Sequence, residues 1–415
     1  MGLIVITLLL QLCSILTAAI AYKPADVIRL DCGAIDNSIS PDKRPWIPDT
    51  GSKFMPPLTS NNSSSVSKAD QQNPSVDQIP YLTARIFPSQ FTYTFPISSG
   101  PKFLRLYFYS ANYSGRDITK SFFNVSAAGH TLLGNFSVFL SAPANSPSFV
   151  KEFVVHVGNS QTLDLTFTPT TSSVDSYAFI NGIEIVSMPD NLYLTGVNSP
   201  NTTLVGKKSS FIVDTSMALE TLYRLNVGGQ SIDVQNDTGM FRRWENDNRY
   251  LKGNLLGKEP FLDFKVLYNN KTPAYTAPEY VYRTQRVMGP DQNNLQFNMS
   301  WIFSVDSGFN YLVRLHFCEF IIDIEGNNQR VFTVYIGDEI ADKPVDVFKR
   351  AGGKFIPVYN DYVVAVDGAI GRKRDMVISL FPYIYSRPLF VDALLNGVEI
   401  FRLNASDGSL TVPNY

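Results

Sequence analysis

Two glutamates, Glu184 and Glu399, occupy the same place in two nearly repeated segments, Ala178–Ile185 and Ala393–Ile400. Two carboxylates that flank a bound sugar can hydrolyse a glycosidic bond, one as acid and the other as base or nucleophile. Each glutamate here, however, stands alone between two aliphatic residues of its own segment. Because they recur in two separate copies, we expect each to form a salt bridge or a strand-edge hydrogen bond, and we predict no glycosidase site.

No other catalytic constellation stands out in the sequence. The three histidines, His130, His156 and His316, lie far apart and have no cysteine or acidic partner at metal-ligand spacing. The sequence also lacks a nucleophile-elbow motif and a Walker-type phosphate loop. His316 aligns with Tyr107 of the other copy, on the outward face of an expected strand, which indicates a half-exposed polar position. We predict no catalytic residues, no bound metal and no cofactor.

Basic side chains concentrate in one part of the second copy. The candidates for binding a polyanion are Lys349, Arg350, Lys354, Arg372, Lys373 and Arg374. The last three follow Val366-Asp367-Gly368, at the tip of an expected hairpin, where they would meet an acidic polysaccharide or an acidic partner surface. The alternative is ordinary solvated charge at a turn. The formal net charge of −2, balanced in both halves, predicts no nucleic-acid partner.

A long internal repeat sets the positions of these residues. Besides the two segments named above, Leu104–Phe108 is matched by Val313–Phe317, and Phe123–Val125 by Phe332–Val334. The copies are offset by roughly two hundred residues, which is too long for a solenoid unit and suits a whole domain. Alternating β-branched and aromatic residues dominate both copies. We predict an all-β protein of two tandem antiparallel β-sandwich domains, related to the jelly roll.

The repeated strands predict which side chains are buried. Leu104, Leu106 and Phe108 alternate with Arg105 and Tyr107, so that one face should lie on the core and the other nearer solvent.

Two local features leave more than one interpretation. Asn181-Gly182 and Asn396-Gly397 could each form a hairpin turn. Alternatively the flanking residues continue one strand in which glycine marks a bulge or a close backbone approach, and we favour the strand. Residues 212–222 have the weakest strand pattern, and we expect a turn or two of helix there, between the domains.

The terminal segments and a linker divide the sequence into two expected domains. Residues 1–21 are apolar and close on small residues, which indicates a secretory signal peptide cleaved before Tyr22; a membrane anchor is the alternative. We place the first domain at 22–190, a linker at 191–217, the second domain at 218–404 and a C-terminal tail at 405–415. No later stretch has the roughly 18 consecutive apolar residues of a membrane span. We expect an exported protein with no membrane span in the mature chain.

Ten N-glycosylation sequons fit passage through the secretory pathway. The candidates are Asn61, Asn62, Asn112, Asn124, Asn135, Asn201, Asn236, Asn270, Asn298 and Asn404. In Phe123-Asn124-Val125 the alternation turns the asparagine away from the core, so a glycan there would point outward. Cys32 and Cys318 are the only cysteines beyond the signal segment. They could form a disulfide between the domains or remain two separate buried thiols.

The sequence resembles the malectin-like domain family over the whole mature chain. In the first copy the resemblance rests on Leu30–Gly33, Pro45-Trp46, Tyr81–Arg85, Leu104–Phe108 and Ala178–Glu184. In the second copy it rests on Phe241–Trp244, Thr284–Arg286 and Arg314–Phe320. This order of motifs is similar to the tandem ectodomain of the plant receptor-like kinases of the FERONIA, ANXUR and THESEUS group.

The resemblance implies a receptor at the cell surface or in the cell wall. Such a receptor recognises a secreted cysteine-rich signalling peptide with a lipid-anchored co-receptor, and is proposed to sense pectin. Family members continue through a membrane helix into a Ser/Thr kinase, whereas this sequence ends at Tyr415 and contains no kinase motif. We expect a non-enzymatic recognition module, either an ectodomain-only relative or part of a longer plasma-membrane receptor. A structural wall protein that binds acidic polysaccharide is the alternative.

The animal founder of the family grips a glucosylated glycan with loop aromatics and an acid. Our alignment places Ile86 and Val287 where one aromatic is expected, and Asn112-Tyr113 and Ile321-Ile322 where an aromatic pair is expected. Asp175 is the nearest acid. Tyr113 is the one well-matched position, and it is therefore the candidate for stacking on a sugar.

Overall fold

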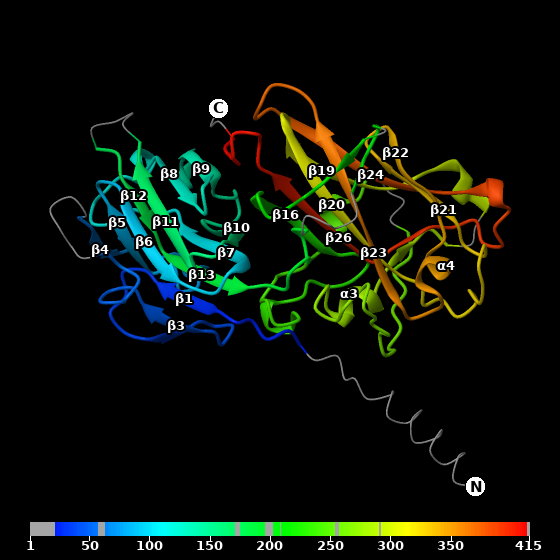
Figure 1. Ribbon diagram of the computed structural model, residues 1–415, viewed down its shortest axis with the longest axis horizontal. Coiled ribbons are helices and arrows are strands. Elements are labelled where there is room, and N and C mark those ends of the chain that lie inside the picture. The colour runs from blue at the N-terminus through cyan, green and yellow to red at the C-terminus, as the bar shows by residue number, and fades with distance from the viewer. Residues whose placement is uncertain are drawn as a thin grey trace, which may run out of the picture.

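Two β-sandwiches lie side by side, the first coloured blue to green and the second green to red (Figure 1). The computed structural model describes residues 21–56, 63–170, 175–195, 202–207, 209–253, 257–289 and 292–412. One long sheet runs through both sandwiches, and a separate four-stranded sheet closes each of them. The predicted fold class, two tandem antiparallel β-sandwiches, is confirmed. The signal peptide expected at 1–21 falls almost wholly outside the described residues.

The long shared sheet joins the domains edge to edge. Its strands in spatial order are β15 (Ser210–Phe211), β14 (Thr202–Leu204), β23 (Pro357–Val366), β20 (Phe309–Cys318), β26 (Gly397–Leu403), β16 (Leu219–Asn226), β10 (Ser148–Val157), β7 (Gly100–Tyr109), β13 (Gly182–Ser187), β1 (Val27–Asp31), β3 (Pro45–Pro48) and β2 (Ser38–Ile39), with β17 (Glu245–Asn246) beside β16. The junction lies between β10 and β16, where Phe153 pairs with Glu220 and Val154 with Leu219. Each domain thereby covers an open strand edge of the other.

Each sandwich has its own outer sheet. The first is β6 (Phe91–Pro96), β11 (Thr162–Pro169), β8 (Phe123–Ala127) and β9 (His130–Phe136), and the second is β19 (Met299–Asp306), β24 (Lys373–Pro382), β21 (Phe332–Ile336) and β22 (Glu339–Val345). In β8 the alternation behaves as predicted, because Phe123 and Val125 are fully buried while Asn124 is exposed. Two separate hydrophobic clusters fill the two sandwiches.

The remaining elements are short. Smaller sheets are β12 (Ala178–Ile180) with β5 (Thr83–Phe87) and β4 (Ser65–Lys68), and β18 (Arg286–Val287) with β25 (Leu394–Leu395). The helices are α2 (Val138–Ser141), α3 (Glu279–Arg283), α4 (Val347–Ala351), η1 (Ile118–Lys120), η2 (Val234–Asn236), η3 (Asn248–Tyr250), η4 (Gln292–Gln296) and η5 (Ile384–Ser386). Within the described segments, no helix has the length and apolar character needed to cross a membrane.

The prediction of a helix at residues 212–222 is wrong. Leu219–Leu222 lie in β16, which pairs with β10 on one side and β26 on the other. A central strand position supplies backbone partners on both edges, and this tertiary pairing outweighs a weak local pattern.

The repeated asparagines mark the points where the chain crosses between sheets. Asn181 separates β12 from β13, which lie in different sheets. Its side-chain carbonyl accepts from the Tyr109 N–H at 2.8 Å, and its amide donates to the Thr83 carbonyl at 2.7 Å. Asn396 accepts equivalently from the Cys318 N–H at 2.7 Å. Neither dipeptide forms a hairpin, and the single strand that we favoured is interrupted by one residue in each copy.

The glycines that follow these asparagines permit the close approach of other side chains, whereas our prediction was a bulge or a close backbone approach. A Cβ on Gly182 would lie 2.6 Å from the Pro80 side chain and 3.2 Å from Trp46. A Cβ on Gly397 would lie 2.8 Å from the Val281 side chain. The Asn-Gly repeat is therefore required by the fold in both domains.

The outward face of the shared sheet is covered, contrary to prediction. Arg105 and Tyr107, expected nearer solvent, are only 3% and 5% exposed. A third hydrophobic cluster lies over the domain junction and includes Phe103, Phe401 and linker residues Leu192–Leu194. The strand pattern alternates in the sequence, but it does not reveal which loops fold back over the sheet.

The C-terminal tail returns to the first domain. Ser409 pairs with Thr131 of β9, and the Leu410 N–H donates to the Thr131 carbonyl at 2.9 Å. Leu410 is fully buried in the first core, whereas Ala405 and Val412 pack against the second. The tail therefore fastens the two sandwiches together.

Candidate functional site

A row of alternating charges crosses the outward face of the shared sheet. In the first domain Arg29, Glu184, Arg105 and Glu152 occupy neighbouring register positions on β1, β13, β7 and β10. Oε1 of Glu184 lies 2.5 Å from Nε of Arg29, and Oε2 lies 2.9 Å from Nη1 of Arg105. Nε of Arg105 lies 2.6 Å from Oε2 of Glu152. Arg44, just before β3, places Nη1 2.9 Å from Glu184.

The second domain repeats this row. Arg224, Glu399, Arg314 and Asp361 are register neighbours on β16, β26, β20 and β23. Nε of Arg224 lies 2.8 Å from Oε2 of Glu399, and Nε of Arg314 lies 2.7 Å from Oδ1 of Asp361. The duplicated glutamate thus has the same function in both copies, and the predicted salt bridge is confirmed.

Glu152 joins the two rows across the domain junction. Its Oε1 lies 2.9 Å from Nη2 of Arg224, while its Oε2 faces Arg105. The Thr221 hydroxyl donates to Oε1 at 2.7 Å. Charges therefore alternate without interruption from β1 to β23. Because removing one partner of a buried ion pair leaves an uncompensated charge, this row opposes any change in the relative position of the domains.

Basic neighbours keep the glutamates of this row ionised. Burial by itself would raise the pKa of Glu184, but the guanidinium groups around it, Arg105 foremost, lower it to about 2. Burial also opposes ionisation of Glu152, whose pKa is lowered to about 2 by Arg224 and Arg105. A general acid needs a pKa near the working pH. These groups are fixed structural charges, and Glu184 and Glu399 are each held in the ion pairs of their own domain.

His316 is buried, which corrects the prediction of a half-exposed position. Its Nδ1 lies 2.9 Å from the Tyr282 hydroxyl, and its Nε2 lies 3.1 Å from Oε1 of Glu399. Burial lowers the pKa of His316, and the bond to Glu399 opposes that shift. The ring is covered because α3, which carries Tyr282, contacts β20. Among the described residues, no group of three or more His, Cys, Asp or Glu side chains could hold a metal ion.

Cys32 and Cys318 are free thiols. They are fully buried in two different hydrophobic clusters, Cys32 in the first sandwich and Cys318 beneath α3. Burial raises the pKa of both thiols well above the ordinary value. Of the two predicted alternatives, the structure contains the separate thiols and not the interdomain disulfide.

Tyr113 cannot stack on a sugar in this conformation. The side chain is fully buried, and its ring centroid lies 5.3 Å from that of Phe179. Its hydroxyl donates to the Tyr109 carbonyl at 3.2 Å and accepts from the Asn181 amide at 2.8 Å. Tyr113 supports the sheet crossing at Asn181, which corrects its assignment as a glycan contact.

Two of the three positions that we aligned with the founder's glycan site in the second domain line a pocket of about 400 Å³, whereas Ile322 does not. Val287 and Ile321 contribute to its wall. Arg330 also lines the pocket and lies between Glu319 and Asp392. Its Nη1 is 2.9 Å from Oε2 of Glu319, and its Nη2 is 2.9 Å from Oδ2 of Asp392. Burial raises the pKa of Glu319, and Arg330 partly offsets this. The pocket has the size of a small-molecule site, but the charge of Arg330 is already paired with those of Glu319 and Asp392.

The six basic candidates do not form one patch. Lys349 and Arg350 lie in α4 and Lys354 follows it, before the start of β23, whereas Arg372–Arg374 come after its end. A strand of ten residues separates the two groups by roughly 30 Å.

The two basic groups also differ in availability. Arg350 is engaged by Asp342 at 2.6 Å. Arg372 ends the turn between β23 and β24, and Lys373 and Arg374 begin β24; all three side chains are exposed, and Lys373 lies 2.8 Å from Asp306. Lys354 is partly buried and donates to the Ile322 carbonyl at 2.9 Å, so only the group Arg372–Arg374 has all three side chains exposed.

Seven of the ten sequons lie among the described residues. The exposed asparagines are Asn112, Asn124, Asn135, Asn236, Asn270 and Asn298. Asn404 is partly buried, and its side-chain carbonyl accepts from the Ala218 N–H at 2.9 Å. Asn61, Asn62 and Asn201 fall outside the described residues.

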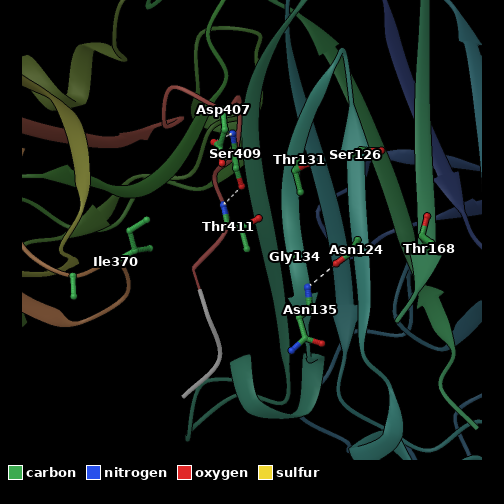
Figure 2. Close-up of a pocket in the computed structure, with 11 residues that line it drawn as sticks. Asn124, Ser126, Thr131, Gly134, Asn135, Thr168, Ile370, Asp407, Ser409 and Thr411 are labelled. Atoms are coloured by element: carbon green, nitrogen blue, oxygen red, sulfur yellow. Dashed lines mark hydrogen bonds between the residues drawn. The ribbon is translucent and has the colours of Figure 1, made fainter. Parts of the chain in front are cut away.

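A cleft of about 870 Å³ opens where the two domains meet (Figure 2). One wall is the outer face of β8, β9 and β11, which presents Asn124, Ser126 and Thr168. The returning tail forms a second side, and Ile370 in the turn between β23 and β24 faces them from the second domain.

Sequence reasoning missed most of the charge row. The sequence draws attention to Glu184, Glu399 and Arg105 individually, but it does not indicate that Glu152 and Arg224 lie beside them. The available signal was charged residues inside otherwise apolar strands at equivalent positions of both copies. Strand order across the junction, which a sequence pattern does not specify, was the missing information.

Comparison with protein families and curated proteins gives consistent results. The malectin-like domain model matches residues 30–403. The receptor-like protein kinase FERONIA of Arabidopsis thaliana is 45% identical over 419 residues, covering 100% of this chain and 46% of that protein. ANXUR1 of the same plant is 36% identical over 397 residues, covering 93% of this chain and 45% of that protein. The chain therefore spans about half the length of the curated relatives it matches.

Solved structures show the same relationship. The crystal structure of the plant receptor-like kinase FER superimposes with a TM-score of 0.85 at 44% identity, covering 94% of this chain and 99% of that chain. FER in complex with the plant peptide RALF23 and LLG2 gives the same TM-score and identity, with 95% and 99% coverage. The ANXUR1 extracellular domain from Arabidopsis thaliana has a TM-score of 0.85 at 35% identity, with 94% and 100% coverage.

Proposed function

The chain belongs to the malectin-like domain family, and we propose that it is an extracellular recognition module that binds a secreted cysteine-rich signalling peptide together with a lipid-anchored co-receptor. It acts by binding and not by catalysis, at the cell surface or in the cell wall. The observation that carries this proposal is its similarity, over 95% of the chain, to the FER chain of the complex with RALF23 and LLG2.

The geometry of the junction supports a binding role. The charge row, the third hydrophobic cluster and the tail hold the two sandwiches in one relative orientation. A ligand that contacts both domains, or a peptide that bridges one domain to a co-receptor, then meets a preorganised surface, and less ordering entropy is lost on binding.

Surface-based binding with purified components tests this proposal. The secreted chain is immobilised, and RALF23 is applied with and without LLG2. We expect peptide binding that LLG2 strengthens roughly tenfold or more, because two ligands that favour the same complex must strengthen each other reciprocally. RALF23 with its cysteines reduced and alkylated is the matched control. Absence of binding by RALF23 and by other cysteine-rich peptides, with and without LLG2, would contradict the proposal.

A second candidate function is binding of acidic cell-wall polysaccharide such as pectin. The observation that favours it is the exposed run Arg372–Arg374. Binding of pectin fragments at two salt concentrations tests it, because contacts between exposed charges weaken as salt rises. A triple variant of Arg372, Lys373 and Arg374 to glutamine should lose this binding. The equivalent triple variant of Lys349, Arg350 and Lys354 is the control, and equal loss in both would exclude a site at the turn.

A further inference from the structure

The cleft between the domains has walls suited to sugar hydroxyls but poorly suited to capturing a free ligand. On the first domain, Thr168 is the cross-strand partner of Asn124, and Thr131 is the partner of Ser126. The tail adds Ser409. These side chains donate and accept hydrogen bonds at a common surface.

The cleft lacks the groups that usually give a free glycan its affinity. Among its described lining residues there is no aromatic side chain, and Asp407 is the only charged one. Aromatic faces supply most of the contact energy for a sugar ring, and basic groups supply it for an acidic polysaccharide. A covalently tethered glycan needs neither, because its attachment provides a high effective concentration.

Asn124 is placed to supply that tether. It is exposed on β8, and Ser126, the hydroxyl residue of its sequon, projects from the same face of the strand two residues later. The side-chain carbonyl of Asn124 accepts from the Asn135 N–H at 2.7 Å. That bond orients the side chain and leaves the amide nitrogen as the attachment atom (Figure 2).

We propose that an N-linked glycan on Asn124 occupies this cleft and bridges the first domain to the returning tail and to the turn between β23 and β24. The inference goes beyond peptide recognition, and it rests only on the expectation that the chain passes through the secretory pathway. In the modification, the amide nitrogen of Asn124 attacks the anomeric carbon of a lipid pyrophosphate-linked oligosaccharide. The new N–C bond replaces the C–O bond to pyrophosphate, which leaves with the amide proton.

The glycan has partners on both sides of the cleft. Ser409 and Thr411 of the tail lie beside β9, and Ile370 on the second domain is 45% exposed toward the opening. Sugar hydroxyls bond the polar wall, while the apolar faces of the rings cover Ile370. The glycan thus stabilises the same arrangement that the tail and the charge row stabilise, and it excludes free ligands from the cleft.

The experiment uses the full chain expressed in a eukaryotic secretory host. Peptide mapping by mass spectrometry reads occupancy at each sequon. Hydrogen exchange then compares wild type with Ser126→Ala, which destroys the Asn124 sequon but keeps the bond between Asn124 and Asn135. Ser126→Thr, which preserves the sequon, is the matched control, and Asn236→Gln removes an exposed sequon elsewhere.

We expect Asn124 to be occupied, and Ser126→Ala to speed exchange at residues 405–412 and 367–372 by roughly threefold or more. Ser126→Thr and Asn236→Gln should leave both segments unchanged. Trimming the wild-type glycans to single N-acetylglucosamine units should reproduce the effect without any substitution. An unmodified Asn124, or exchange unaltered by its loss, would overturn the inference. If no sequon at all is modified, the expectation of export fails with it. Modification only at other sequons, which include Asn135 in the same cleft, isolates the failure to Asn124.

Discussion

Oε1 of Glu152, in the first domain, lies 2.9 Å from Nη2 of Arg224, in the second. The same carboxylate contacts Arg105 of its own domain at 2.6 Å. One side chain therefore connects two rows of charges that gene duplication would otherwise leave separate. The contact stands beside the backbone pairing of β10 with β16, so electrostatics and strand register specify the same interface.

Replacing Glu152 with glutamine should destabilise the protein by about 3 to 5 kcal/mol, because two guanidinium groups then remain buried without their shared counter-charge. Urea unfolding followed by tryptophan fluorescence measures this change. Glu245→Gln is the matched control. Its partner Arg249 is 67% exposed, and exposed pairs contribute only about 0 to 1 kcal/mol. If both variants lost a similarly small part of the free energy of unfolding, the importance of the junction pair would be contradicted.

Acid should weaken the same row. The pKa values of Glu152 and Glu184 are lowered from 4.5 to about 2 in the folded protein. A carboxyl group whose pKa is lower in the folded than in the unfolded state stabilises the folded protein at pH values above its unfolded pKa. This stabilisation is lost as the pH falls through the folded pKa. The free energy of unfolding should therefore decline between about pH 4.5 and about pH 2. Urea titrations across this range measure the slope, which Glu152→Gln should reduce; an unchanged slope would count against this assignment.

Asp31 should show the opposite dependence. Burial, with a smaller contribution from Asp49, raises the pKa of Asp31 to about 6, although the hydroxyls of Ser38 and Thr83 donate to it. A raised folded pKa means that the folded state binds the proton more tightly, so the associated stability is present at low pH and is lost as the pH rises to about 6. Asp31→Asn has no such loss. Its stability relative to wild type should increase between about pH 4 and pH 6, and parallel pH profiles would refute this.

Docking of the tail should depend on the absence of a side chain at Gly134. A Cβ there would lie 2.5 Å from Cγ2 of Thr411. We expect Gly134→Ala to destabilise the protein by about 1 to 3 kcal/mol and to speed hydrogen exchange at Leu410. The double variant Gly134→Ala with Thr411→Gly lacks the opposing side-chain atoms of Thr411, and it should regain much of the lost stability. Gly158→Ala is the control because a Cβ at that position meets nothing within 4 Å. A double variant no more stable than the single one would exclude this contact as the cause.

The two cysteines should be unreactive until the protein unfolds. Both are buried and free, and burial raises the pKa of each thiol. Because the thiolate is the nucleophile, iodoacetamide should modify neither Cys32 nor Cys318 in native protein and both in urea without reductant. Mass spectrometry counts the additions. Modification in urea only after reduction would indicate the interdomain disulfide instead.

Local patterns predicted much of the framework. The alternation around Phe123–Val125 predicted which side chains face the core. The duplicated Asn-Gly segments predicted a bulge or a close approach, and at Gly182 the side chains of Pro80 and Trp46 approach closely. Local patterns were misleading at residues 219–222, where pairing with β10 and β26 overrides a weak propensity. They also misplaced Tyr107 and His316, because burial of an alternating strand depends on loops that return from distant parts of the chain.

By itself the sequence determined that this is a duplicated all-β protein, because period-two alternation and the internal repeat are encoded locally. Only the tertiary structure decided that the copies share one sheet, that Glu152 and Arg224 meet, and that the tail and Asn124 border one cleft. These relationships join residues far apart in the chain. Their energies depend on strand order and on exclusion of water at the junction, and neither exists until both domains have folded together.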